Sequence, residues 1–225
     1  MSSARSTAAL DPERSVVEQL RERMAAMEQK TALQPVPTLS GIADLVPLHA
    51  GATYAVDSAS LALALVAAAS QAGEWVGFAG CTDFGVEAAA ELGIELSRTV
   101  LVPDPGEHWL EVTAALVDVL RVVVLRPPSS VDERSAGILG SRLRTRSSVL
   151  VVHGHWPRVE ARLSIERSGW SGPASGSGQL QERRARVVVH RGARPPQRAD
   201  LTWPGLQRVV ASADAPVREI RRVTG

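Results

Sequence analysis

The chain has 225 residues, of which 44% are hydrophobic, and a formal net charge of +1 at neutral pH, which suits one sizeable globular core. No apolar run reaches the roughly 20 residues of a membrane helix, so a membrane-spanning helix is excluded and a soluble, cytoplasmic protein is expected. The single cysteine, Cys81, excludes an internal disulfide, in keeping with a reducing cytoplasm.

The charge is divided unevenly along the chain. Residues 1–140 hold 9 basic and 18 acidic side chains, whereas residues 141–225 hold 16 basic and 6 acidic ones. This asymmetry predicts that the second part meets an anionic surface, either nucleic acid or an acidic protein. The alternative interpretation is a bias toward arginine codons with solvated charged faces, and the sequence leaves both open.

The N-terminal region is predicted to lie apart from the core. Residues 1–10 lack the apolar centre of a secretory signal and are expected to be a disordered tail. A helix is predicted from Asp11 to about Lys30, because Asp, Pro and Glu in succession suit the first helical turn. Its apolar side chains form one narrow stripe: Val17, Leu20, Met24 and Met27. Residues 11–37 are therefore predicted to be an amphipathic helix and a linker, whose stripe needs a groove in this domain or in a partner.

Residues 38–205 are predicted to form one α/β core, since strands and helices alternate as in a mostly parallel sheet flanked by helices. Strands are expected at residues 53–56, 74–79, 99–102, 121–125 and 148–153, and helices at 61–72, 86–92, 109–120 and 130–145. From Val159 onward, strand-like segments follow one another without a helix, which predicts an antiparallel C-terminal extension with a solvated basic face. Residues 206–225 are expected to be a basic tail.

The turn after the first core strand reads Ala55-Val56-Asp57-Ser58-Ala59-Ser60. In α/β nucleotide-binding proteins, glycine N–H groups and a lysine in this turn cradle phosphates. This turn has neither, and the single lysine of the chain, Lys30, lies upstream. Asp57 is expected to direct a carboxylate at any phosphate bound there, so the turn is predicted to be closed to nucleotides.

The order of these segments resembles the RecA core over residues 40–205, and LALALVAAASQAG is similar to the helix after the RecA phosphate loop. More narrowly, the chain resembles the ImuA′ family, the RecA-like accessory proteins of an inducible translesion mutasome. The segments that carry this resemblance are YAVDSASLALAL, AAAELGIELSRTVLVPDPGEHWLEV, VVLRPP and VLVVHGHWPRVEARL. The resemblance implies a RecA-like α/β fold.

Three parts of the site depart from RecA-like ATPases. Asp57-Ser58-Ala59 stands where these have Gly-Lys-Thr, with Ser60 a near match for the hydroxyl that binds magnesium. The glutamate that activates water falls near Cys81-Thr82, and Arg126 replaces the aspartate that holds magnesium. The resemblance therefore implies a degenerate site without catalytic residues, cofactor or metal ion, in a protein that is not an enzyme.

By this resemblance, the protein is expected to be an adaptor in damage-induced translesion synthesis. It would link an ImuB-like, inactive Y-family polymerase homologue and, indirectly, an error-prone replicative-type polymerase, and associate with the nucleoid after DNA damage. Docking is expected through the stripe of the N-terminal helix and through the C-terminal residues Val217, Ile220, Arg221 and Arg222. The alternatives are a non-specific single-stranded DNA-binding protein, and a modulator whose partner is the RecA filament.

Aromatic and cationic side chains also gather near the last parallel strand: Trp156, Arg158, Arg162, Arg167 and Trp170. They are the ingredients of a platform on which single-stranded bases stack while phosphates pair with arginine. Their irregular spacing equally fits tryptophans packed in the core and arginines on a solvated face. His153 and His155 lie two residues apart but lack a third clustered ligand, so ordinary strand-end histidines are expected rather than a metal site.

Overall fold

The structure, a computed structural model, describes residues 34–171 and 182–207. The predicted tail at residues 1–10, the predicted helix after it and the tail from residue 208 lie outside the described residues. So do all eight predicted docking residues: Val17, Leu20, Met24, Met27, Val217, Ile220, Arg221 and Arg222.

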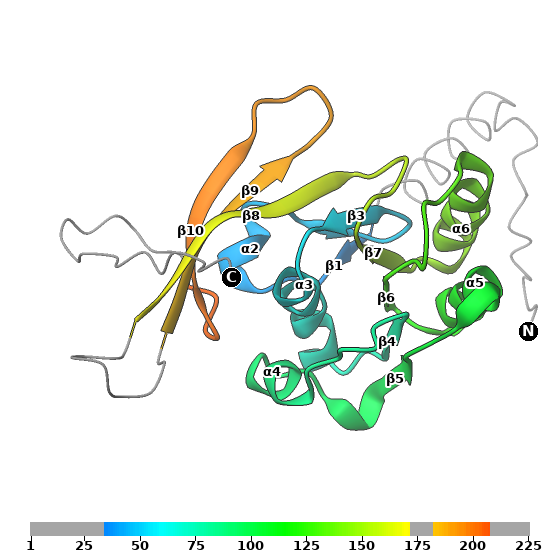
Figure 1. Ribbon diagram of the computed structural model, residues 1–225, viewed down its shortest axis with the longest axis horizontal. Coiled ribbons are helices and arrows are strands. Elements are labelled where there is room, and N and C mark those ends of the chain that lie inside the picture. Colours follow the sequence, from blue (N-terminus) through cyan, green and yellow to red (C-terminus); the bar gives the residue numbers. More distant parts are fainter. Residues whose placement is uncertain (1–33, 172–181, 208–225) are drawn as a thin grey trace, which may run out of the picture. The chain divides into compact units, whose positions relative to one another are not determined.

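One eight-stranded sheet organises the described core (Figure 1). Its strands are β3 (Thr53–Val56), β4 (Val76–Ala79), β5 (Thr99–Val102), β6 (Val122–Leu125), β7 (Val149–His153), β8 (Ala161–Ser171), β9 (Glu182–His190) and β10 (Gln197–Trp203). They lie in the order β10-β9-β8-β3-β7-β6-β4-β5. The strands from β8 to β5 are parallel, and β9 runs antiparallel to both β8 and β10. The predicted fold class, a mostly parallel α/β sheet with an antiparallel C-terminal extension, is confirmed.

The predicted core helices are all present, and none of their ends differs by more than three residues from the expectation. They are α3 (Ala59–Gln71), α4 (Val86–Glu91), α5 (Trp109–Val119) and α6 (Glu133–Arg146). The short helices are α2 (Ser40–Ala43), η1 (Leu96–Arg98) and η2 (Gly106–His108). Helix α3 begins where the Ser58 hydroxyl accepts the Leu61 N–H at 3.4 Å. It carries no charged residue and is buried along most of its length, as a helix apolar on all sides should be.

The sheet has a separate hydrophobic core on each face, because side chains alternate along its strands. Val122 and Val124 of β6 join the core that contains α3 and the inner residues of β8–β10. Val123 and Leu125 join the core under α5 and α6. This alternation explains why β6 and β7 read as continuous apolar runs in the sequence.

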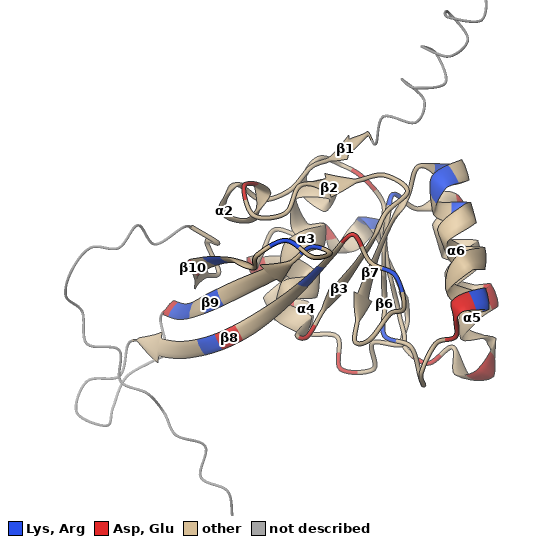
Figure 2. Cartoon of the chain, turned by 90° about the horizontal axis from the view of Figure 1, so that it is seen from above, with Lys and Arg blue, Asp and Glu red and all other residues tan. Residues whose placement is uncertain are grey.

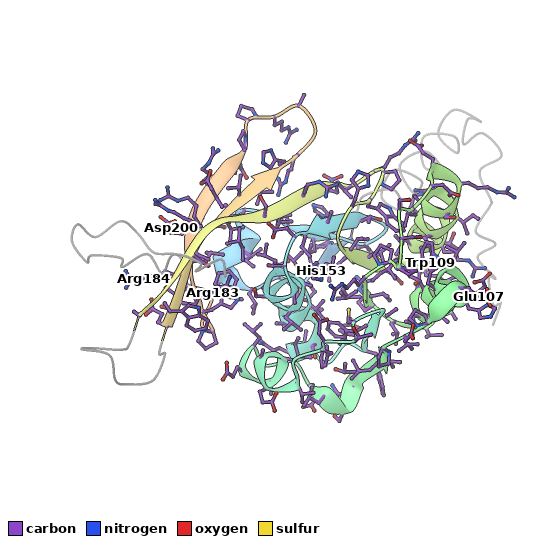
Figure 3. The ribbon with its side chains drawn as sticks, viewed as in Figure 1. Glu107, Trp109, His153, Arg183, Arg184 and Asp200 are labelled. Carbon is purple, nitrogen blue, oxygen red and sulfur yellow. The ribbon has the colours of Figure 1, made fainter. Side chains whose placement is uncertain are left out.

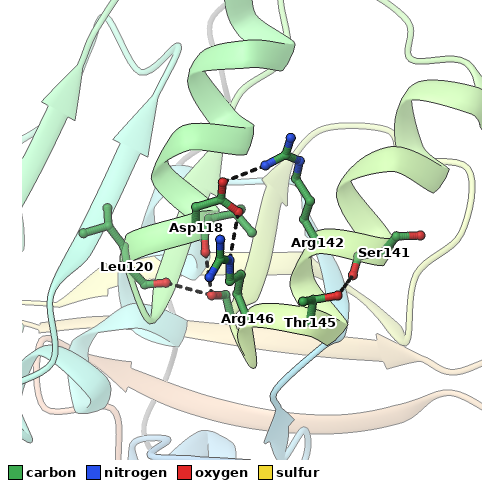
Figure 4. Close-up of polar contacts among 8 residues, drawn as sticks. Asp118, Leu120, Ser141, Arg142, Thr145 and Arg146 are labelled. Atoms are coloured by element: carbon green, nitrogen blue, oxygen red, sulfur yellow. Dashed lines mark hydrogen bonds and ion pairs between the residues drawn. The ribbon is translucent and has the colours of Figure 1, made fainter.

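Polar contacts hold α5 against α6 on the second face (Figure 4). The Asp118 carboxylate on α5 accepts hydrogen bonds from Arg142 at 2.6 Å and from Arg146 at 3.3 Å, both on α6. Desolvation raises the pKa of Asp118, but the two guanidinium groups outweigh it and the net pKa is lowered. Beside them, the buried Ser148 hydroxyl lies 2.8 Å and 2.9 Å from the carbonyl oxygens of Val117 and Leu120. These contacts fix the start of β7 to the end of α5.

The end of the predicted linker is attached to the core. Pro35–Val36 forms the short strand β1, which pairs antiparallel with β2 (Leu48–His49). The Val36 side chain is buried in the first core, and the Gln34 carbonyl accepts the Ala50 N–H at 2.8 Å. The core therefore includes Val36, two residues before the start that was predicted at residue 38, because this side chain is buried.

Candidate functional site

The carboxyl ends of the central strands meet at one edge of the sheet, where open α/β sheets bind their ligands. Val56 of β3 pairs with His153 of β7, and Leu125 of β6 pairs with both Ala79 of β4 and Val152 of β7. The residues that follow these strands therefore share this edge. The three positions predicted to be degenerate are brought together there: Asp57–Ser60, Cys81–Thr82 and Arg126.

Asp57 makes hydrogen bonds to the backbone of β8. Its carboxylate accepts the Ile165 N–H at 3.0 Å and 3.3 Å, and its own N–H donates to the Leu163 carbonyl at 3.2 Å. The turn after β3 is thereby tied to β8. The Asp57 carboxylate, which was predicted to face any phosphate bound at this turn, is held in place by a backbone N–H beside a register shift in β8.

Arg126 and Asp83 form an ion pair at 2.9 Å across the same edge. The hydrogen bond from Arg126 lowers the pKa of Asp83. Burial, followed by the charge of Asp83, raises the pKa of the Cys81 thiol to about 11. At neutral pH this thiol is protonated and a poor nucleophile. Arg126, which was predicted to replace a magnesium ligand, is thus a cation that is paired with Asp83.

The hollow at this edge is small. It has a volume of about 30 Å³ and is lined by Ala59, Leu63, Cys81 and His153 among others. The rings of Phe78 and Phe84 lie beside it with centroids 4.6 Å apart. Ligand pockets usually measure about 300–1,000 Å³, so this hollow does not accommodate a nucleotide.

A larger cleft, of about 600 Å³, opens between α3, α4 and the ends of β8, β9 and β10. Trp170 of β8 and Trp203 of β10 both lie directly opposite Arg183 of β9. Residues opposite one another on antiparallel strands project from the same face, so the three side chains form one row. We call this row, Trp170–Arg183–Trp203, the cleft floor; Figure 3 shows Arg183 near the end of the extension. Sequence analysis identified Trp170 alone, because the row depends on strand register.

The guanidinium of Arg183 is held in place at the cleft floor. Its carbon lies 5.6 Å from the centre of the Trp203 ring. It donates hydrogen bonds to Ser60 Oγ at 2.9 Å and to Ser168 Oγ at 3.4 Å. Burial lowers the pKa of Arg183 from its ordinary value. The site thus places a partly desolvated cation beside the start of α3.

The residues considered for nucleic-acid binding do not form one surface. Trp156 is only 2% exposed and packs in the second core. Arg158 pairs with Glu133 at 2.8 Å, and Arg162 donates to the carbonyl oxygens of Gly154 and Trp156. Arg167 and Trp170 remain exposed on β8. Core packing, the alternative interpretation, therefore holds for Trp156.

The outward face of the extension carries arginines beside acidic side chains (Figures 2 and 3). The ion pairs there are Arg184–Glu182 at 2.9 Å, Arg186–Asp200 at 2.7 Å and Arg198–Glu166 at 3.6 Å. Hydrogen bonds from Arg186 lower the pKa of Asp200. Three arginines of the solvated basic face predicted for this extension are thus paired with acidic side chains, whereas Arg167, which lies opposite Arg186, remains exposed.

Among residues 34–171 and 182–207, no group of three or more His, Cys, Asp or Glu side chains is placed to hold a metal ion. None of the described helices has the length and apolar character needed to cross a bilayer.

The fold and this edge define an α/β protein with a mostly parallel sheet, in which the positions that were compared with those of RecA-like ATPases make contacts within the chain. The family model described as MT3502 N-terminal domain matches residues 44–158. The uncharacterized protein Rv3395c of Mycobacterium tuberculosis (strain ATCC 25618 / H37Rv) is 35% identical over 162 residues, which cover 68% of this chain and 78% of that protein. The chain belongs to the MT3502 N-terminal domain family.

Proposed function

We propose that this protein is a non-catalytic, RecA-like adaptor of damage-induced translesion synthesis, as its resemblance to the ImuA′ family implies. It would associate with the nucleoid after DNA damage and link an ImuB-like protein to an error-prone polymerase. The observation that carries the proposal is the engagement of Asp57 by the Ile165 N–H at 3.0 Å. A polyphosphate at this turn would meet a fixed carboxylate, and breaking such a charge-assisted hydrogen bond costs about 1.5–3 kcal/mol.

The single-stranded DNA alternative receives less support. Arg184, Arg186 and Arg198 on the outward face are paired with carboxylates, and Trp156 is not accessible for stacking. A phosphate backbone would have to compete with these carboxylates for the guanidinium groups. The RecA-modulator alternative depends on the N-terminal arm, which lies outside the described residues.

Capture of an ImuB-like protein tests the adaptor function. The full chain is expected to retain a purified ImuB-like protein on a column. Serine at Val17, Leu20, Met24 and Met27 should reduce retention at least about tenfold, because the substitutions remove the apolar stripe that we propose as the docking surface.

The matched control places serine at Glu18, Glu22 and Gln29, on the opposite face of the same predicted helix, and should leave retention unchanged. Removal of residues 208–225 tests the C-terminal candidates in the same assay. Full retention after both the stripe substitutions and the C-terminal removal would show that docking does not use the two ends. Absence of retention by the full chain would reject the adaptor proposal.

A calorimetric titration of Mg-ATP into the purified full chain is expected to give no saturable heat, so that any Kd lies above about 1 mM. The reasons are the engaged Asp57 carboxylate, the Arg126–Asp83 ion pair and the small hollow at the edge of the sheet. A phosphate-loop ATPase titrated under the same conditions serves as the positive control. Saturable binding with phosphate release would contradict the proposal and restore an enzymatic role.

A further inference from the structure

The Arg183 guanidinium differs from its neighbours on β9 in its lack of an acidic partner. Arg184 and Arg186 project from the opposite face and pair with Glu182 and Asp200. Arg183 has no carboxylate within ion-pair distance among residues 34–171 and 182–207; its partners are two serine hydroxyls and the Trp203 ring. A partly buried cation bound only by neutral groups has a strong tendency to take an anion.

The surroundings of this cation are apolar and aromatic. Ala59 and Leu63 of α3 and Leu92 after α4 line the cleft, and Trp170 stands at the floor with 45% of its surface exposed. The indole N–H of Trp203 is buried and lacks an acceptor among the described residues. The cleft volume of about 600 Å³ matches that of sites that take a few side chains or a small ligand.

From this arrangement we infer that the cleft binds a peptide segment of a partner protein, in which a side-chain carboxylate lies beside an aromatic or aliphatic side chain. The carboxylate pairs with Arg183, which lies between the two indoles of the cleft floor. The apolar side chain of the peptide packs between Trp170 and the α3 wall, where it covers the exposed indole surface. Tryptophan and arginine are the residue types that most often dominate protein interfaces.

The opposite wall of the cleft favours a single negative charge over several. The carboxylates of Asp83 and Glu91 line this wall, and Asp83 is paired with Arg126 outside the Arg183 cluster. A phosphate group or a nucleic-acid backbone brings more negative charge close to these two acids than one carboxylate does, and is repelled more strongly. The cleft therefore selects an acidic peptide rather than a nucleotide.

This inference rests on the proposed adaptor function only for the statement that the ligand belongs to a protein partner. The chemistry of the cleft depends only on residues of this chain: the cleft floor, the apolar side chains of α3 and the acidic side chains of the opposite wall. The two proposals can therefore fail separately.

The test is a titration of the ¹⁵N-labelled full chain, followed through the indole N–H resonances of Trp170 and Trp203. The probes are acetyl-Ser-Phe-Asp-Ser-amide, its neutral analogue with Asn in place of Asp, and adenosine monophosphate, which joins a ring to a phosphate. The Asp peptide is expected to shift both resonances and to bind at least about tenfold more tightly than the Asn peptide and the nucleotide.

Two variants test whether the preference depends on the Arg183 guanidinium or on positive charge anywhere on β9. Arg183→Gln should abolish the preference for Asp over Asn, whereas Arg184→Gln, one residue along β9 and on the other face, should preserve it. If Arg183→Gln fails to fold, Trp170→Ala provides the test instead, because it changes an exposed side chain. This variant should weaken binding of the Asp peptide at least fivefold. Equal binding of the Asp and Asn peptides, tighter binding of the nucleotide, equal losses in the two arginine variants, or no shift would each overturn the inference.

Column capture of the ImuB-like protein distinguishes failure of the peptide-binding inference from failure of the adaptor proposal. Capture without any Arg183-dependent peptide binding rejects the cleft and keeps the adaptor. Arg183-dependent peptide binding without capture keeps the cleft and rejects the mutasome partner.

Discussion

Replacing Trp156 with alanine is expected to lower the free energy of unfolding by about 3–5 kcal/mol. Trp156 is 2% exposed and packs with the residues of β6, β7, α5 and α6 that form the second core. Removal of the indole leaves a cavity that the surrounding strands and helices cannot fill without moving, so the cavity adds to the lost burial. Urea unfolding followed by far-ultraviolet circular dichroism measures the change.

Trp170→Ala is the matched control, because it removes the same indole from β8, where 45% of the residue is exposed. Its cost is expected to be about 1 kcal/mol or less. Single-stranded DNA binding should be unaffected by Trp156→Ala when measured well below the unfolding midpoint. A stable Trp156→Ala variant that had lost DNA binding would reverse the assignment and make Trp156 a contact residue.

The two tryptophans show what sequence alone could decide in this chain. The α/β class, the order of the core elements and the antiparallel extension follow from alternating helical and strand-like patterns, and each was predictable. Trp156 and Trp170 have similar basic neighbours in the sequence. They are distinguished only by the loop after β7, which turns Trp156 into the core under α6, and no local pattern records that contact.

The candidate sites depended on contacts between distant residues. Asp57 could be recognised as unsuited to phosphate, but its partner Ile165 lies 108 positions away in the sequence, and only the β3–β8 register joins them. Arg183 gave no signal because it is one of three arginines between positions 183 and 186, and only the strand register shows that it faces the opposite side of the sheet from Arg184 and Arg186. Its row with Trp170 and Trp203 requires the pairing of three strands across two connections.

Gly80→Ala is expected to cost about 2–4 kcal/mol, because the substitution combines backbone strain with a collision. Gly80 follows β4 with φ +74°, a left-handed conformation that costs an alanine about 1–2 kcal/mol. A Cβ atom there would lie 2.1 Å from the carbonyl oxygen of Arg126, which is a backbone atom of the neighbouring turn. The Gly80 N–H also donates to Val102, and the Arg126 N–H donates to Ala79, so neither turn can move away freely.

Gly192→Ala separates the two contributions. Gly192 has φ +50°, but a Cβ atom added there meets no other atom within 4 Å, so this variant should lose only the backbone contribution of about 1–2 kcal/mol. If the two variants unfold in urea with the same slope, the difference between their midpoints reports how closely the turn after β4 packs against the turn after β6. These turns carry Cys81 and Arg126, the positions where an ATPase would hold its base and its metal ligand. Equal losses in the two variants would mean that the turns separate readily, and the edge of the sheet would then have room to open for a ligand.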